Sequence, residues 1–180
     1  MKLSLSILAL AAAVALPAFA AETYVGADIG RSKLEENVGG VSISKNETAW
    51  AIFGGYQFHP NFAAELAYRD LGKISEREGS VSANLQAHAV QLSVIGSYPI
   101  NEQFSVYGRL GLGAIRAKAE VRAPGFYMAE KSDTKTKALV GIGARYAINK
   151  QFGIRTEYAE FGKIEGLKLS TFTVGADYSF

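Results

Sequence analysis

Seven charged residues stand apart from one another in segments that are otherwise uncharged. Four are acids and three are arginines: Asp28, Glu65, Glu157, Asp177, Arg109, Arg145 and Arg155. They share their face of each segment with glycine and other small residues, which fits a crowded interior. Ions taken out of water are expected to pair. Two interpretations remain open: a salt-bridged plug that fills the interior, or a gate whose pairs exchange to open a narrow ion path.

The two histidines offer little for catalysis. A catalytic triad needs a nucleophile, a base and a group that orients the base. His59 falls in a short turn, and His88 has Ser82 nearby in sequence but no evident orienting acid in register. The chain has no cysteine and shows no metal-ligand spacing or phosphate-binding glycine motif. We therefore predict that the protein is not an enzyme and that it uses no metal or cofactor.

The charged residues lie in segments where apolar and polar residues alternate with a period of two, which is typical of β-strands. In Ala49–Phe58 the even positions carry the large apolar residues, and Phe53 is the exception on the other face. Eight such segments occur, at about residues 24–30, 49–58, 62–69, 90–98, 104–113, 140–146, 152–158 and 172–180. An even number suits a closed single-chain barrel. The predicted fold is all-β: an eight-stranded antiparallel up-and-down transmembrane β-barrel.

The connections between these segments alternate in length. Short turns are predicted around Pro60, at residues 99–103 and at residues 149–151. Longer polar connections fall at about residues 32–47, 72–83, 119–136 and 161–167, and we expect them to be solvated loops. Short turns on one rim and long loops on the other are typical of outer-membrane barrels.

The first twenty residues form a separate unit. Lys2 precedes an apolar run from Leu3 to Leu16, and Ala18-Phe19-Ala20 is a small-x-small cleavage site. We predict a secretory signal peptide at residues 1–20 and a barrel at residues 21–180. A net charge of +2 gives no case for a nucleic-acid partner. The absence of cysteine suits an exported chain that does not depend on disulfides.

Alternation alone leaves open whether the apolar face looks inward, as in a soluble barrel, or outward to lipid. Aromatic residues sit on that face next to the short turns, as in a girdle at a membrane interface: Phe58, Phe62, Tyr98, Phe104, Tyr146, Phe152 and Phe180. The charged face is rich in glycine. We therefore predict that the apolar face contacts lipid, at even positions through most of the chain and at odd positions in the first strand.

Five short sequences now carry a resemblance to the transmembrane domain of the outer membrane protein A family. They are Phe53-Gly54-Gly55-Tyr56-Gln57, Tyr98-Pro99-Ile100, Tyr107-x-Arg109-Leu110-Gly111, Tyr146-Ala147-Ile148 and Arg155-x-Glu157-Tyr158. Each is weak alone, but they follow in the same order through nearly the whole mature chain. The terminal Tyr178-x-Phe180 is similar to the signal read by the barrel assembly machinery. The chain stops at Phe180, so we expect it to lack the family's peptidoglycan-binding domain.

The resemblance also bears on the lumen charges. It implies that Glu65 and Arg155 pair, because they match a glutamate and an arginine that pair in the family. A family lysine that can compete for that glutamate is replaced here by Ile95, and the signs at Asp28 and Arg145 are reversed relative to the family. Balance with exchanged signs favours the structural plug over the gate.

Four basic residues point outward by parity, near the rim of the longer connections: Arg31, Arg116, Lys118 and Lys168. We expect Arg31 and Lys168 to be neighbours once the barrel closes. One hypothesis is that the four contact phosphates of lipopolysaccharide. The alternative is ordinary snorkelling or water-facing charge.

The predicted function is that of an integral protein of the bacterial outer membrane with a structural role in envelope integrity and with surface-exposed loops. Its expected partners are outer-membrane lipid, lipopolysaccharide and the barrel assembly machinery. Two alternatives remain: an adhesin or host-factor-binding protein acting through its loops, and a low-conductance pore for ions or small solutes. An eight-stranded interior is just filled by side chains, so a pore of this size should conduct little.

Overall fold

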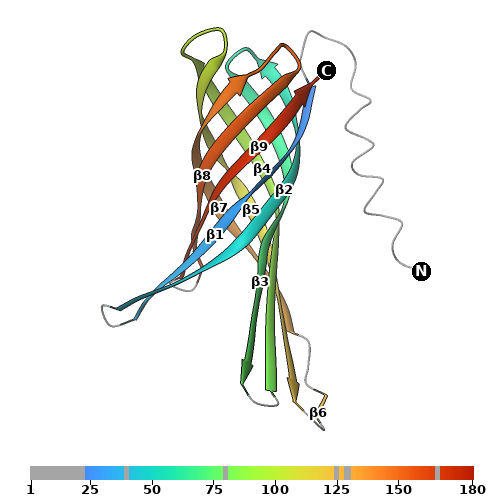
Figure 1. The fold of residues 1–180 in the computed structure, drawn as a ribbon, viewed down its shortest axis with the longest axis vertical. Coiled ribbons are helices and arrows are strands. Elements are labelled where there is room, and N and C mark those ends of the chain that lie inside the picture. The colour runs from blue at the N-terminus through green and yellow to red at the C-terminus, as the bar shows by residue number, and fades with distance from the viewer. Residues whose placement is uncertain (1–22, 39–40, 79–80, 124–125, 128–130, 165–166) are drawn as a thin grey trace, which may run out of the picture.

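The computed structural model describes residues 23–38, 41–78, 81–123, 126–127, 131–164 and 167–180. The predicted signal peptide and its cleavage site lie outside these residues. Eight long strands form the fold (Figure 1): β1 Thr23–Val38, β2 Val41–His59, β3 Phe62–Glu78, β4 Val81–Pro99, β5 Phe104–Ala123, β7 Lys131–Ala147, β8 Phe152–Ile164 and β9 Leu167–Ser179. In the described ranges no helix is long and apolar enough to cross a membrane.

The eight strands close into a barrel, which confirms the predicted fold class. Each pairs antiparallel with the next long strand in sequence, and β1 pairs with β9 from Tyr24↔Ser179 to Glu35↔Lys168. An extra two-residue strand, β6 (Phe126–Tyr127), pairs only with the end of β5. Because the sheet closes on itself, no edge is left within the membrane-spanning part, as a lipid environment requires.

Two of the short turns share one side-chain device. Asn101 Oδ1 accepts hydrogen bonds from the backbone N–H groups of Gln103 at 2.9 Å and Phe104 at 2.7 Å. Asn149 Oδ1 accepts the equivalent bonds from Gln151 at 2.9 Å and Phe152 at 2.7 Å. An asparagine that takes over backbone donors in this way fixes a tight turn without further residues.

The predicted long loops are largely wrong, because the strands run on through them. Pairing of β1 with β2 continues to Val38↔Val41, and pairing of β3 with β4 continues to Glu78↔Val81. Pairing of β2 with β3, in contrast, ends at Trp50↔Asp70. The β1–β2 hairpin therefore swings away from the β3–β4–β5 extension (Figure 1). Polar composition indicated solvent exposure, but the ladder hydrogen bonds continue there between the two strands of each hairpin.

The point of divergence is held by a few residues of β1 and β3. Gly72 has a φ of 97°, and its N–H donates to Asp70 Oδ1 at 2.8 Å within an irregularity between Asp70 and Lys73. Ser32 on β1 donates its hydroxyl to the backbone oxygen of Leu71 at 2.7 Å. These bonds satisfy backbone groups where the β2–β3 ladder stops, as buried backbone requires.

The outer face of the barrel is apolar, as predicted. The side chains next to the short turns are exposed and aromatic on most strands, including Phe58, Phe62, Tyr98, Tyr146, Phe152 and Phe180. At the opposite edge of the apolar band, which we call the upper edge, the last apolar residues are also exposed: Ile29, Trp50, Tyr68, Val90, Leu112, Val140, Tyr158 and Phe172. The first strand follows the opposite parity, with Val25 and Ile29 outward.

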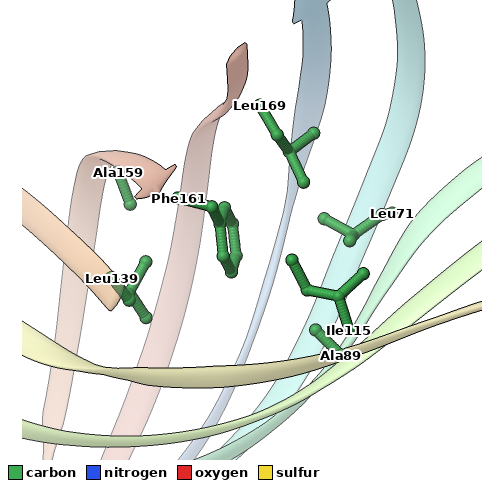
Figure 2. Close-up of a cluster of buried hydrophobic side chains, with 7 residues drawn as sticks. All are labelled: Leu71, Ala89, Ile115, Leu139, Ala159, Phe161 and Leu169. Carbon is green, nitrogen blue, oxygen red and sulfur yellow. The ribbon is translucent and has the colours of Figure 1, made fainter. Parts of the chain in front are cut away.

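The lumen at the upper end is filled by a second, apolar core that the sequence analysis did not predict (Figure 2). Leu71, Ile115, Leu139, Phe161 and Leu169 converge there with two alanines, and Leu139 is 1% exposed. All these residues share the parity of the lumen charges. The interior is therefore layered, with ions in the middle and hydrocarbon towards the long hairpins.

We predict that Gly72→Ala lowers the free energy of unfolding by about 1–3 kcal/mol, because an L side chain at positive φ is strained. A Cβ there would also lie 2.7 Å from Cβ of Glu47. Urea unfolding of the refolded protein, followed by the fluorescence of the single tryptophan, measures the change. Gly108→Ala is the control, because a Cβ at Gly108 meets its nearest atom at 4.0 Å. Equal stability of the two variants would contradict this account of the bulge.

Candidate functional site

Glu65 lies at the centre of the lumen between two arginines. Arg155 donates from Nη1 to Oε2 at 2.7 Å, and Arg109 donates from Nη2 to Oε1 at 2.7 Å. Arg109 also donates from Nε to Glu157 Oε2 at 3.0 Å. All four side chains are buried. The pairing expected for Glu65 and Arg155 is thus confirmed, and Arg109 joins both carboxylates into one network.

A sixth ion that the sequence analysis left out completes this network. Arg69 forms a bidentate pair with Asp28, with both nitrogen–oxygen distances at 2.9 Å. Arg155 Nη2 lies 3.8 Å from Asp28 Oδ2 and links this pair to Glu65. The central network therefore holds three acids and three arginines. Arg69 has the parity of the lumen residues and stands four positions after Glu65, so parity alone could have found it.

Arg145 and Asp177 form a separate pair nearer the short turns. Arg145 Nε donates to both carboxylate oxygens of Asp177 at 3.0 Å. The guanidinium lies over Gly153, where a Cβ would come within 2.7 Å of Nε and Cζ. Its side chain is 31% exposed, whereas the arginines of the central network are 6% exposed or less. The seven predicted charges are thus divided between two levels of the lumen.

Two tyrosines supply further donors to the central carboxylates. Tyr24 donates its hydroxyl to Glu65 Oε2 at 3.0 Å, and Tyr107 donates to Glu157 Oε2 at 3.0 Å. Each ring lies against a glycine directly opposite in register, Gly55 for Tyr24 and Gly143 for Tyr107. Neutral donors to an ion-paired carboxylate raise its hydrogen-bond saturation without adding charge.

Phe53, the exception to the alternation, faces the lumen. Its ring lies beneath the guanidinium of Arg155, with Cζ 3.3 Å from the ring centroid. The ring occupies the space opposite Gly26, its partner in register. Cation–π contact stabilises an arginine from which water has been removed. The apolar residue on the polar face is therefore part of the charge site.

The two ends of the lumen differ. At the end of the short turns a cavity of about 270 Å³ is lined by Arg145, Asp177, Ile95 and the rings of Tyr24 and Tyr107. Towards the upper edge, the apolar core of Figure 2 lies beyond the central network. Ile95, which replaces the family lysine, is buried against Ala63 and Tyr107. Around Glu65 the described groups that bind its carboxylate are Arg109, Arg155 and Tyr24.

The outward bases do not form one group. Arg31, Arg116 and Lys168 are exposed as predicted, while the side chain of Lys118 lies outside the described residues. The expected contact of Arg31 with Lys168 is wrong: Arg31 lies opposite Phe172 and Lys168 opposite Glu35. That offset of four residues corresponds to roughly 13 Å along a strand. The parity was right, but adjacency depended on a register that parity does not give.

Acids accompany the bases near β9. Lys168 Nζ lies 4.0 Å from Glu160 Oε1, and Lys33 Nζ lies 2.5 Å from Glu35 Oε1. The hydrogen bond from Lys33 lowers the pKa of the Glu35 carboxyl below its usual value. Arg116 stands apart from these, on β5, with three strands between it and β1.

His88 has an acid in register, contrary to the prediction. Asp70 on β3 lies directly opposite it, and Arg116 lies opposite it on β5. The position that a nucleophile would need across from the imidazole is thus occupied by an arginine. His59 lies in its turn, where Nδ1 accepts from the N–H of Asn61 at 3.1 Å. Among the described residues no group of three or more His, Asp or Glu could hold a metal ion.

Known proteins resemble this chain over most of its length. The family model described as the OmpA-like transmembrane domain matches residues 18–174. Outer membrane protein A of Shigella flexneri is 30% identical over 164 residues, which cover 83% of this chain and 47% of that protein. The chain thus spans about half the length of the curated relatives it matches.

Solved structures share the fold at lower identity. The attachment invasion locus protein Ail of Yersinia pestis, solved with the heparin analogue sucrose octasulfate, superposes with a TM-score of 0.67 at 22% identity, covering 90% of this chain and 100% of that one. Neisserial surface protein A gives a TM-score of 0.70 at 17% identity, covering 88% of this chain and 97% of that one. At these identities the likeness concerns the fold.

We predict that Asp28→Asn and Arg69→Gln each lower the free energy of unfolding by about 3–5 kcal/mol, because each leaves its buried partner uncompensated. The double variant should cost clearly less than the sum of the two. Urea unfolding of all four proteins gives the coupling energy. The exposed pair Lys33 and Glu35 serves as control and should couple by about 1 kcal/mol or less. Additive effects at Asp28 and Arg69 would contradict the network.

Proposed function

Since the chain belongs to the OmpA-like transmembrane domain family, we propose that it is a structural barrel of the outer membrane that supports envelope integrity and does not act as a pore. The observation that carries this proposal is the filled lumen. Six paired ions cross its middle, and an apolar core follows them towards the upper edge. Opening a path would require both layers to move.

The ion network favours a fixed plug over a gate. Glu65 has two arginine partners and a tyrosine donor, so an exchange would break several short bonds at once. Truncating one partner of a buried pair costs about 3–5 kcal/mol. The place of the competing lysine in the family is taken by Ile95, which brings no charge to Glu65. These features support a closed barrel.

Export and assembly are part of the same proposal. Residues 1–20 would direct the chain through the inner membrane and be removed. Tyr178 and Phe180 would then present the terminal signal to the barrel assembly machinery. Their rings stack edge to face at 5.1 Å on the final strand, with Phe180 70% exposed. The family's outer-membrane location supports this order of events.

A second candidate function is binding of a host surface through the long hairpins. The observation that favours it is the extension of β1–β2 and of β3–β4–β5 beyond the apolar band (Figure 1). Ail, whose fold is similar, was solved with a heparin analogue. A rigid hairpin presents side chains at low entropic cost, so it suits recognition better than a free loop.

We predict that planar-bilayer recordings of the refolded protein show no sustained conductance. Removing the apolar core with Leu139→Ala and Phe161→Ala should still give little current, because the ion network remains. Adding Glu65→Gln and Arg155→Gln to those changes should produce measurable openings. Sustained conductance of the unmodified protein, abolished by Glu65→Gln, would instead support the gate.

Complementation of a deletion strain separates the structural role from adhesion. We predict that detergent sensitivity is restored to normal both by the full chain and by a variant in which residues 34–45 are replaced by a two-residue turn. Adhesion to host cells, if it depends on the β1–β2 hairpin, should be lost in the shortened variant alone. A matched trim of residues 74–85 tests the other extension. Failure of the full chain to restore detergent resistance would overturn the structural proposal.

A further inference from the structure

The upper edge of the apolar band carries a row of polar and aromatic side chains on β2 to β5. Register places Trp50 opposite Asp70, Asp70 opposite His88, and His88 opposite Arg116. Paired residues of adjacent strands share a face of the sheet. Arg116 and Trp50 are exposed, which places the whole row on the outside of the barrel.

Aromatic rings cover one side of the imidazole. The ring of Tyr68 stacks on His88 with centroids 5.9 Å apart and planes 29° apart. Trp50 packs on Tyr68 with centroids 6.1 Å apart. Tyrosine and tryptophan with one apolar and one polar side are typical of the membrane interface. The row therefore lies at headgroup depth.

The residues directly below the row are apolar and face outward. Val90 follows His88 on the same face of β4, and Leu112 lies below Arg116 on β5; both are exposed, at 49% and 57%. A ligand whose charged group reaches Arg116 and whose remainder lies on this surface must be amphiphilic. That geometry suits a membrane lipid rather than a soluble anion.

The donors in the row are Arg116 and His88. Asp70, the acid in the row, uses Oδ1 to accept the N–H of Gly72 at 2.8 Å. A guanidinium binds a phosphate through paired N–H groups, and an imidazole N–H adds a further bond. Near β9, in contrast, Lys168 and Lys33 each have an acid within 4.0 Å.

We propose that Arg116 and His88 bind a phosphate of lipid A, the lipid of the outer leaflet, with the rings of Tyr68 and Trp50 beside the sugar. This inference rests on the proposed outer-membrane role. It narrows the four outward bases to one site: Arg116 gains a partner donor in His88, whereas Arg31 and Lys168 belong to a different side of the barrel. The acyl chains would lie on Val90 and Leu112.

The test uses the refolded barrel in maltoside micelles with EDTA, which excludes phosphate-bearing detergent and bridging cations. Diphosphoryl lipid A is the probe, and native mass spectrometry gives its Kd. The fluorescence of Trp50, the single tryptophan, reports binding next to the site. Arg116→Gln should weaken binding by about tenfold, because it removes a charge-assisted pair. His88→Gln should weaken it by roughly threefold, as expected for one neutral hydrogen bond.

Arg31→Gln and Lys168→Gln are the matched controls and should leave the Kd within about twofold, as expected of bases outside the site. Arg116→Lys should recover only part of the affinity, since a lysine lacks the guanidinium fork. Dephosphorylated lipid A should bind weakly to every variant. Heat-modified mobility on gels confirms that each variant is folded, so that a lost affinity is not a lost barrel.

Three results would overturn the site. Arg116→Gln could bind as tightly as the unmodified chain. All four base variants could weaken binding equally, which would indicate diffuse surface charge. Inorganic phosphate or sucrose octasulfate could compete as well as lipid A does, which would indicate a soluble anion as the ligand. None of these outcomes touches the structural role, because that role is judged by detergent resistance in the complemented strain.

Discussion

The burial of ions in a lumen with no room for bulk water is the constraint on which the rest of the interior depends. Each buried ion must have an opposite charge beside it. Glu65 on β3 meets this need with Arg155 of β8 and Arg109 of β5, and Asp28 of β1 meets it with Arg69 of β3. The partners lie far apart in sequence. A slip of one residue in any of these strands would turn a charge towards lipid, so the network also enforces the register.

The network in turn explains where the glycines lie. Eight strands enclose a space that side chains just fill, and the rings of Tyr24, Tyr107 and Phe53 need part of it. Each of these rings lies opposite a glycine of the neighbouring strand, where even a Cβ would come within 2.5 Å of the ring. The glycine-rich face of the sequence is therefore a packing surface for the rings that support the ions.

A period of two reported the side of each residue faithfully, because the pleat fixes it. That was enough for the fold class, the girdle and the position of the seven charges. It did not give register, which is why Arg31 and Lys168 were wrongly expected to touch and Asp70 was not placed beside His88. It also did not mark where a strand leaves the membrane. The apolar core around Leu139 has lumen parity, but its residues lie where polar composition had suggested loops.

The short segment from Arg69 to Gly72 shows how closely the inside and the outside of this barrel are coupled. Arg69 holds Asp28 in the lumen, and Asp70 lies on the outer face beside His88. Leu71 enters the apolar core and accepts the hydroxyl of Ser32, and Gly72 takes the positive φ that lets β3 part from β2. Successive residues thus serve the plug, the membrane surface, the core and the divergence of the hairpins. A change in the outer row can move the bulge by a bond only, because the ion pair beside it is anchored on β1. The interior therefore acts as a rigid reference that keeps the outward side chains at a fixed depth, and variation in function is left to residues whose side chains face away from it.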